Sequence, residues 1–209
     1  MRTRVTQNRN DNCRCRYPAR SGRPRHTNDA SLRADTRSTR RSSRAINGDC
    51  IAGGHELAEF CDIRITVPHA RFGHQEIKWG LMPGAGGCSR LPRIVGLGRV
   101  MELILTGRLY DADEALRIGF VTKIVEPRGL TDEALTIAGR IACNGPLAVR
   151  AAKQTILRGV GRPLTDNIPF ETETLSYLCK SEDWTRGQQA FLTGGKAGAP
   201  RSMTWCLSP

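Results

Sequence analysis

The spacing of hydrophobic and polar residues predicts both strands and helices from Ala45 onward. Residues 62–67 and 120–125 are rich in β-branched side chains, and the first segment alternates in polarity, as strands do. Elsewhere apolar residues recur every three or four positions, often with acids near the start of the segment and glycine near its end, as in amphipathic helices. Helices are predicted at 55–60, after a turn at 83–87, and at 100–106, 111–118, 131–142, 146–157, 171–179 and 182–192. Strands interleaved with helices indicate an α/β domain.

The first 44 residues have a different composition. Their large apolar side chains are Met1, Val5, Tyr17 and Leu32, too few to offset the entropy of ordering the chain, so we expect this segment to be disordered. Three explanations compete: a mitochondrial transit peptide, a nucleic-acid-binding arm, or sequence that was never selected as protein, such as a mispredicted start or an out-of-frame translation. The abrupt change of composition at Ala45 favours the third.

The charge of the chain changes at the same place. Lys and Arg number 32 and Asp and Glu number 20, for a net charge of +12. Residues 1–44 hold 13 Arg and 3 Asp, so they carry +10 and the rest of the chain is almost neutral. A basic surface throughout would indicate a nucleic-acid or membrane partner. This distribution favours neither as a partner of the α/β domain.

Other classes of protein and site are excluded by what the sequence lacks. No run of 18 apolar residues is present, which excludes a transmembrane helix, and no apolar stretch near residue 1 could serve as a secretory signal. Cys13 and Cys15, with His26 at a distance, are a weak indication of metal binding. The sequence therefore predicts no metal site.

Two carboxylates, Glu56 and Glu76, are the candidates for acid–base chemistry. Glu56 lies in the first turn of a helix that begins at Gly53–Gly54, and backbone N–H groups at such a helix end can stabilise an oxyanion. Each carboxylate also has a structural interpretation, because a first-turn Glu complements the helix dipole and a loop Glu commonly forms a solvated ion pair. The 83–87 turn could cradle a phosphate or simply begin a helix, and it lacks the phosphate-loop pattern.

Three linked stretches resemble the enoyl-CoA hydratase/isomerase (crotonase) family: AINGDCIAGGHELAEFCDIRI, ARFGHQEIKWGLMPGAGGCSRLPRIVG and MELILTGRLYDADEALRIGFVTKIVE. The resemblance is nearly unbroken from Ala45 to about Val125 and continues more loosely to about Lys196. It implies the α/β ClpP/crotonase fold of β-β-α spiral turns, with a C-terminal helical region used for oligomerisation. The chain would then divide into a leader (1–44), a core with the catalytic motifs (45–145), and a helical region with a frayed tail (146–209).

The resemblance also implies an activity, the hydration of the C2–C3 double bond of a 2-enoyl-CoA, which is a lyase reaction of fatty acid metabolism. Gly53 matches one of the two backbone donors of the family's oxyanion hole. Glu56 matches the residue that orients and deprotonates water, and Glu76 the residue that moves a proton at C2. Substrate contacts are implied for Gly54, Pro83, Gly84, Gly86, Gly87 and Lys196. Coenzyme A belongs to the substrate, and no metal or redox cofactor is implied.

Several positions depart from the family pattern. Ala52 replaces the first glycine of the usual triplet, which we expect to be a mild change, and Gln75 replaces a common proline. His55 is unusual, and we expect it to face solvent or pack rather than act as a base. Gly194–Gly195 stand where the family usually has a Lys-Arg pair, so contact with the phosphates of CoA is weakened there, and Lys196 would substitute in part.

The largest departure precedes Ala45. Family domains carry strands and helices there, including an F-x-A-G-x-D-like stretch that supplies the second oxyanion donor, and residues 1–44 contain nothing similar. We therefore expect an N-terminally incomplete domain with an unpaired sheet edge and exposed apolar surface. Loss of one oxyanion donor typically lowers the rate by a factor of ~10²–10³.

Four functions stay open at this point. The presence of both glutamates favours an enoyl-CoA hydratase. The others are a catalytically impaired crotonase-fold fragment, an enoyl-CoA isomerase, and an RNA-binding homologue that uses the Arg-rich leader. The resemblance implies a homotrimer or hexamer, and we expect a location in the cytoplasm or the mitochondrial matrix.

Overall fold

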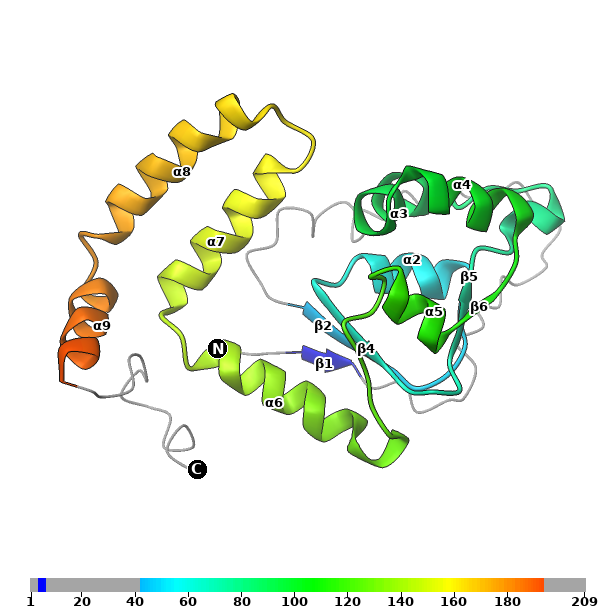
Figure 1. The fold of residues 1–209 in the computed structure, drawn as a ribbon, viewed down its shortest axis with the longest axis horizontal. Helices are drawn as coiled ribbons and strands as arrows, with labels where there is room; N and C mark the ends of the chain where they lie inside the picture. Colours follow the sequence, from blue (N-terminus) through cyan, green and yellow to red (C-terminus); the bar gives the residue numbers. More distant parts are fainter. Residues whose placement is uncertain (1–3, 7–41, 194–209) are drawn as a thin grey trace, which may run out of the picture. The chain divides into compact units, whose positions relative to one another are not determined.

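The computed structural model describes residues 4–6 and 42–193, which Figure 1 traces in chain order. The chain divides into two compact units, one that ends at Leu135 and one that begins at Thr136. The domain boundaries expected after residues 44 and 145 stay predictions.

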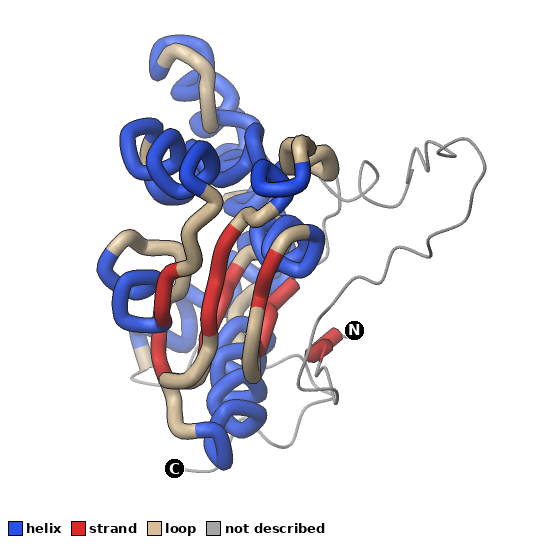
Figure 2. Tube along the Cα trace, turned by 90° about the vertical axis from the view of Figure 1, so that its right-hand side faces the viewer, coloured by secondary structure: helices blue, strands red, loops and turns tan. Residues whose placement is uncertain are grey.

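Two small sheets form the centre of the first unit, where the strands lie next to one another (Figure 2). The first sheet is parallel throughout, in the order β1–β2–β4–β7. In the second sheet β3 is parallel to β5, and β5 is antiparallel to β6. The strands are β1 (Arg4–Thr6), β2 (Ser42–Ile46), β3 (Cys50–Ile51), β4 (Ile63–Thr66), β5 (Arg71–Gly73), β6 (Tyr110–Asp111) and β7 (Lys123–Ile124). The α/β class predicted from the sequence is confirmed.

Strand β1 differs from the expectation of a leader without regular structure. Arg4–Thr6 pairs in parallel with Ser42–Arg44, the first residues of β2, so the sheet begins before Ala45. Strand pairing uses backbone groups, and these are available whatever the side chains. The rest of the leader, residues 1–3 and 7–41, lies outside the described residues.

Helices cover these sheets. They are α2 (Gly53–Glu59), α3 (Gly87–Val95), α4 (Leu97–Thr106), α5 (Ala112–Arg117), the beginning of α6 (Leu130–Ala142), and the 3₁₀ turns η2 (Glu76–Trp79) and η3 (Pro127–Gly129). Helix α2 packs on β3 and α3, α3 packs on α4, and α5 packs on β5, β6 and β7. The fully buried core between them includes Phe72, Phe120, Ile65 and Leu91. Among the described residues, no helix is both long enough and apolar enough to cross a bilayer.

The strand predicted at 120–125 is shorter in the structure, where β7 covers Lys123–Ile124. The N–H groups of Phe120 and Val121 donate to the carbonyl of Ala115 at 2.8 and 3.2 Å, so these two residues close the end of α5 instead of joining the sheet. Lys123–Ile124 pairs with β4, and the N–H groups of Thr122 and Val125 on either side donate to the β4 carbonyls of Arg64 and Thr66, both at 2.8 Å.

The second unit is helical. It contains the end of α6, then α7 (Pro146–Gly159), α8 (Leu164–Leu178) and α9 (Glu182–Leu192), and α7 packs against α8. Helix α9 has the predicted bounds, and the Ser181 hydroxyl accepts the N–H of Trp184 at its start. Helix α8 begins well before the predicted residue 171 and contains Pro169 in its interior. A proline therefore does not end this helix, contrary to the usual rule.

Ala52 has an unusual backbone conformation at the junction of β3 and α2. Its φ of 55° and ψ of −126° lie in a region that glycine adopts easily and a residue with a Cβ does not. Among the described residues it is the only non-glycine residue with positive φ. The replacement of glycine by Ala52 is thus a strained change, and the expectation that it is mild is wrong.

Ala52→Gly should therefore stabilise the chain. Strain of this kind costs about 1–3 kcal/mol, whereas the greater freedom of glycine in the unfolded chain costs roughly 0.5–1 kcal/mol. We expect the free energy of unfolding to rise by about 1 kcal/mol, measured by denaturant titration of both proteins. A decrease would mean that Ala52 is unstrained in the folded chain.

Candidate active site

Glu56 is fixed by the turn that precedes α3. It lies in the first turn of α2, and its side chain is buried. Its Oε1 accepts the backbone N–H groups of Ala85 at 2.6 Å and of Gly87 at 3.0 Å. The 83–87 turn, which the sequence left open between a phosphate cradle and a helix start, is thus a helix start that also binds a carboxylate.

The pKa of Glu56 is raised. Burial is the largest cause, and the hydrogen bonds from Gly87 and Ala85 together with the charge of His74 offset only part of it. A carboxylate with a raised pKa is a stronger base toward water, because its pKa lies closer to the operating pH.

The backbone at the start of α2 leaves donors facing outward. The carbonyl of Ala52 accepts the N–H groups of His55 at 2.8 Å and of Glu56 at 3.1 Å. Gly53 and Gly54 precede His55 in the helix, so their N–H groups have no acceptor within it. Unpaired donors of this kind can bind an oxyanion, and the oxyanion role of Gly53 stays a prediction.

Glu76 has a buried partner rather than a solvated one. It is the first residue of η2 and is half-buried. Its Oε2 lies 3.5 Å from Nδ1 of His74, whereas Arg71 pairs with Asp49 at 2.7 Å. Although burial alone would raise the pKa of Glu76, its interaction with His74 lowers it overall.

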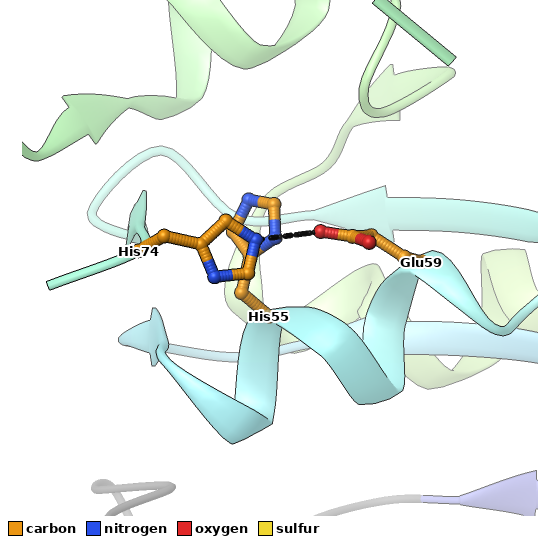
Figure 3. Close-up of side chains that lie close together, drawn as sticks. All are labelled: His55, Glu59 and His74. Carbon is orange, nitrogen blue, oxygen red and sulfur yellow. Dashed lines mark hydrogen bonds and ion pairs between the residues drawn. The ribbon is translucent and has the colours of Figure 1, made fainter. Parts of the chain in front are cut away.

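His74 belongs to a buried cluster with His55 and Glu59 (Figure 3). Oε1 of Glu59 accepts hydrogen bonds from Nδ1 of His55 and from Nε2 of His74, both at 2.7 Å. The His55 ring also stacks on Phe120, with centroids 4.3 Å apart, and its Nε2 lies 2.6 Å from the hydroxyl of Tyr110. His55 and Glu59 come from α2, and His74 comes from the loop after β5.

The two histidines have opposite pKa shifts. Burial lowers the pKa of His55 to about 4, so its ring is neutral at physiological pH. Burial opposes the charge on His74 too, but its hydrogen bond to Glu59 and its ion pair with Glu76 outweigh burial and raise its pKa to about 9. The pKa of Glu59 is lowered, because the bonds from both histidines outweigh its burial. The cluster therefore holds one carboxylate and one imidazolium.

Sequence reasoning missed this cluster. Of the two outcomes expected for His55, packing is the observed one, because its side chain is completely buried. The sequence pattern predicts no role for Glu59 or His74. The available signal was the spacing of His55 and Glu59, which at i and i+4 share one helix face. The position of His74 on that face depends on the tertiary fold.

The same three side chains could ligate a metal, since their donor atoms lie within 4.8 Å of one another. They are the one group of this kind found in the described part of the chain. The sequence-based expectation of no metal stays a prediction.

Most of the remaining candidate residues lie in the 83–87 turn. Gly87, which donates to Glu56, and Pro83 are buried, Gly84 is exposed, and Gly86 caps α3 with a φ of 111°. Lys196 and the neighbouring Gly194–Gly195 lie outside the described residues. No CoA contact is assigned to them by the structure.

Comparison with known proteins identifies the family. The enoyl-CoA hydratase/isomerase family matches residues 43–198, about three quarters of the chain. The chain belongs to this family. A short-chain enoyl-CoA hydratase of Clostridium acetobutylicum is 44% identical to it over 148 residues, which are 71% of this chain and 57% of that protein. A crotonyl-CoA hydratase of Syntrophomonas wolfei is 41% identical over 153 residues, 73% of this chain and 59% of that protein.

Solved structures of the family show the same fold. An enoyl-CoA hydratase of Bacillus anthracis superimposes with a TM-score of 0.78 at 37% identity, covering 80% of this chain and 65% of that one. An enoyl-CoA hydratase subunit of Geobacillus kaustophilus gives a TM-score of 0.78 at 36% identity, covering 82% and 66%. The predicted crotonase fold is confirmed. The chain spans a little under three fifths of the length of these two curated hydratases.

Proposed function

We propose that the chain hydrates a 2-enoyl-CoA thioester. The observation that carries this proposal is the pair of family carboxylates: Glu56 is fixed by two backbone donors, Glu76 is coupled to His74, and the two carboxylates interact electrostatically. Water addition to a conjugated thioester needs a base for the water and a proton for C2. The family membership and the two curated hydratases support the same reaction.

The division of labour is the one that the family resemblance implies. Glu56, with its raised pKa, removes a proton from water as the oxygen bonds to C3. Glu76 delivers a proton to C2, and the negative charge that develops on the thioester oxygen is stabilised by the N–H of Gly53. The reaction consumes one water and forms a 3-hydroxyacyl-CoA.

The proposed substrate class is a short-chain 2-enoyl-CoA. Two of the curated relatives are named for short-chain or crotonyl substrates, at 44% and 41% identity. Coenzyme A enters as part of this substrate.

We also propose a homo-oligomer. Large apolar side chains of the first unit are exposed on η2, the segment after it and α4, as an oligomer interface would require. They are Trp79, Leu81, Met82, Leu97, Met101 and Leu105. Sedimentation of the purified chain checks the state of assembly.

The test of the activity uses the purified chain and crotonyl-CoA. Hydration should remove the ultraviolet absorbance of the conjugated thioester and give a product heavier by one water. A chain that unfolds cooperatively yet leaves crotonyl-CoA unchanged would refute the proposal. Conversion of a 3-enoyl-CoA into the conjugated isomer, without hydration, would instead identify an isomerase.

A further inference from the structure

Glu59 and His74 have no role in the proposed reaction, yet His74 forms an ion pair with Glu76, and Glu59 accepts a hydrogen bond from His74. We propose that Glu59 and His74 form a buried positioning pair that holds a proton beside Glu76 and supplies it for transfer to C2 of the substrate. This inference rests on the proposed function, in which Glu76 delivers that proton. Its structural part can be tested without turnover.

The charges of the three side chains determine which atom donates and which accepts in each hydrogen bond of the cluster. An ionised Glu59 only accepts, so Nδ1 of His55 and Nε2 of His74 must both carry hydrogen. Since His55 is neutral, its Nε2 has a lone pair and accepts the hydroxyl of Tyr110 at 2.6 Å. Glu59 is thereby fixed by two donors at 2.7 Å and can hold His74 as an imidazolium.

The other ring nitrogen of His74, Nδ1, lies near the carboxylate of Glu76. Nδ1 of His74 and Oε2 of Glu76 are both buried, and neither has a hydrogen-bond partner among the described residues. They lie 3.5 Å apart, close enough for an ion pair and a little too far for a good hydrogen bond. A small closing movement, of the kind that substrate binding often produces, would complete the bond.

The other charged groups around His74 are compatible with this pairing. Glu56 and Glu76 both interact with the His74 charge, and both favour the imidazolium. The neutral ring of His55 lies 4.3 Å from that of His74. Arg64, on β4, interacts with Glu59, and the Cys88 thiol interacts with Glu56, Glu59 and Glu76. Among the described residues, His74 is the cation that forms an ion pair with Glu76, and its proton can be transferred.

The proton balance of the step is simple. Nδ1 of His74 gives its proton to the ionised Glu76, and Glu76 passes that proton to C2, so Glu76 ends the step ionised and His74 ends it neutral and paired with Glu59. Glu56 meanwhile holds the proton taken from water. Solvent then returns a proton to His74 and removes one from Glu56, so the enzyme is restored.

The distances favour this pair over a metal. A tetrahedral zinc ion with bonds of about 2.0–2.1 Å keeps its ligand atoms about 3.3 Å apart. Both nitrogens lie 2.7 Å from the same oxygen of Glu59, which is the length of a charge-assisted hydrogen bond. A metal would have to separate all three groups and displace the proton on His74.

The first experiment is NMR of the folded chain labelled with ¹⁵N-histidine, with His55→Gln and His74→Gln used to assign the signals. At pH 7 we expect both ring nitrogens of His74 to carry hydrogen, and His55 to carry one on Nδ1 alone. The His74 ring should titrate near pH 9. A neutral His74 at pH 7 would overturn the proposal, whether or not the chain turns over substrate.

The second experiment is kinetic. His74→Gln and Glu59→Gln should each lower kcat about 10- to 100-fold with little change in KM, because Glu76 loses its support and its proton source. The wild-type kcat should fall as the pH rises through about 9, and this alkaline decline should disappear in both variants.

Two variants serve as controls. Asp49→Asn removes a half-buried carboxylate that pairs with the exposed Arg71 and should retain the wild-type kcat and pH profile. Cys88→Ser should retain the alkaline decline, because the thiol at this position is exposed and is not its cause. Wild-type kcat and pH dependence in His74→Gln would refute the positioning role.

The metal alternative has its own measurement. Zinc content of the purified chain, and zinc titration of the chelator-treated chain, should show no stoichiometric binding. One tightly bound zinc per chain that is lost in Glu59→Gln would overturn the ion pair. An inactive wild-type chain with a charged His74 would instead refute the hydratase proposal and leave the pair intact.

Discussion

Glu56→Gln should lower kcat by a factor of about 10²–10⁴ while the chain stays as stable as the wild type or becomes more stable. The side-chain oxygen of Gln can still accept the N–H groups of Ala85 and Gly87, so the 83–87 turn keeps its anchor. The amide has no basicity, and water addition then lacks its base. Turnover of crotonyl-CoA measures the first effect and denaturant unfolding the second.

The expected gain in stability follows from the sign of the pKa shift. The pKa of Glu56 is higher in the folded chain than in the unfolded one, mainly because of burial, so its ionised form destabilises the fold. That cost is present above the folded pKa and disappears as the pH falls below the unfolded value. At pH 7 the neutral amide avoids it. Activity lost together with stability kept or gained is typical of a residue retained for function.

Glu102→Gln is the matched control. Glu102 lies on α4 in an exposed ion pair with Arg108, and such pairs contribute little to stability. We expect no change in kcat. Equal losses of activity in Glu56→Gln and Glu102→Gln would show that the assay reports folding rather than catalysis, and full activity of Glu56→Gln would remove Glu56 from the mechanism.

The sequence predicted those parts of the site that depend on local pattern. Gly53, Glu56 and the 83–87 turn follow from helix-end chemistry and the family motif, and each lies at the expected point of an element. The partners of these groups could not be predicted in this way. Ala85 donates to Glu56 across 29 residues of chain, and His55 meets Tyr110 across 55.

The errors at element boundaries have physical causes of the same kind. The β-branched residues after Phe120 indicated a strand, but the N–H of Phe120 is taken by the carbonyl of Ala115 at the end of α5. The backbone of Ala52 could not be read from composition either, since its positive φ is imposed by β3 on one side and α2 on the other. At Phe120 a helix-end hydrogen bond to a residue five positions earlier overrode the strand propensity, and at Ala52 the N–H is taken by the carbonyl of Gly73 on β5.

Gly87→Ala should reduce stability and activity together. The backbone of Gly87 is an ordinary helical one, so the cost comes from the added Cβ, which would lie 2.7 Å from Cβ of Pro83 and 2.9 Å from Cε1 of His74. Neither neighbour can move freely, because Pro83 is buried in the turn and His74 is held by Glu59. Overpacking of this kind costs about 1–3 kcal/mol.

The loss of activity follows from the position of Gly87 between Glu56 and His74. Its N–H donates to Glu56, and the Cβ added to it would press on the His74 imidazole that pairs with Glu76, so the substitution displaces both carboxylates. A displacement of about 1 Å can lower the rate about 10²-fold. We expect the kcat for crotonyl-CoA to fall by about that factor, with a lower midpoint of denaturation.

Gly98→Ala provides the comparison. Gly98 lies in α4 with nothing within 4 Å of the added Cβ, so Ala should leave activity unchanged and stabilise the helix by up to about 1 kcal/mol. Wild-type behaviour of Gly87→Ala would mean that Pro83 and His74 are free to move. If His74 is rigid, Gly87→Ala should lose both stability and activity. The proposed positioning of Glu76 depends on that rigidity.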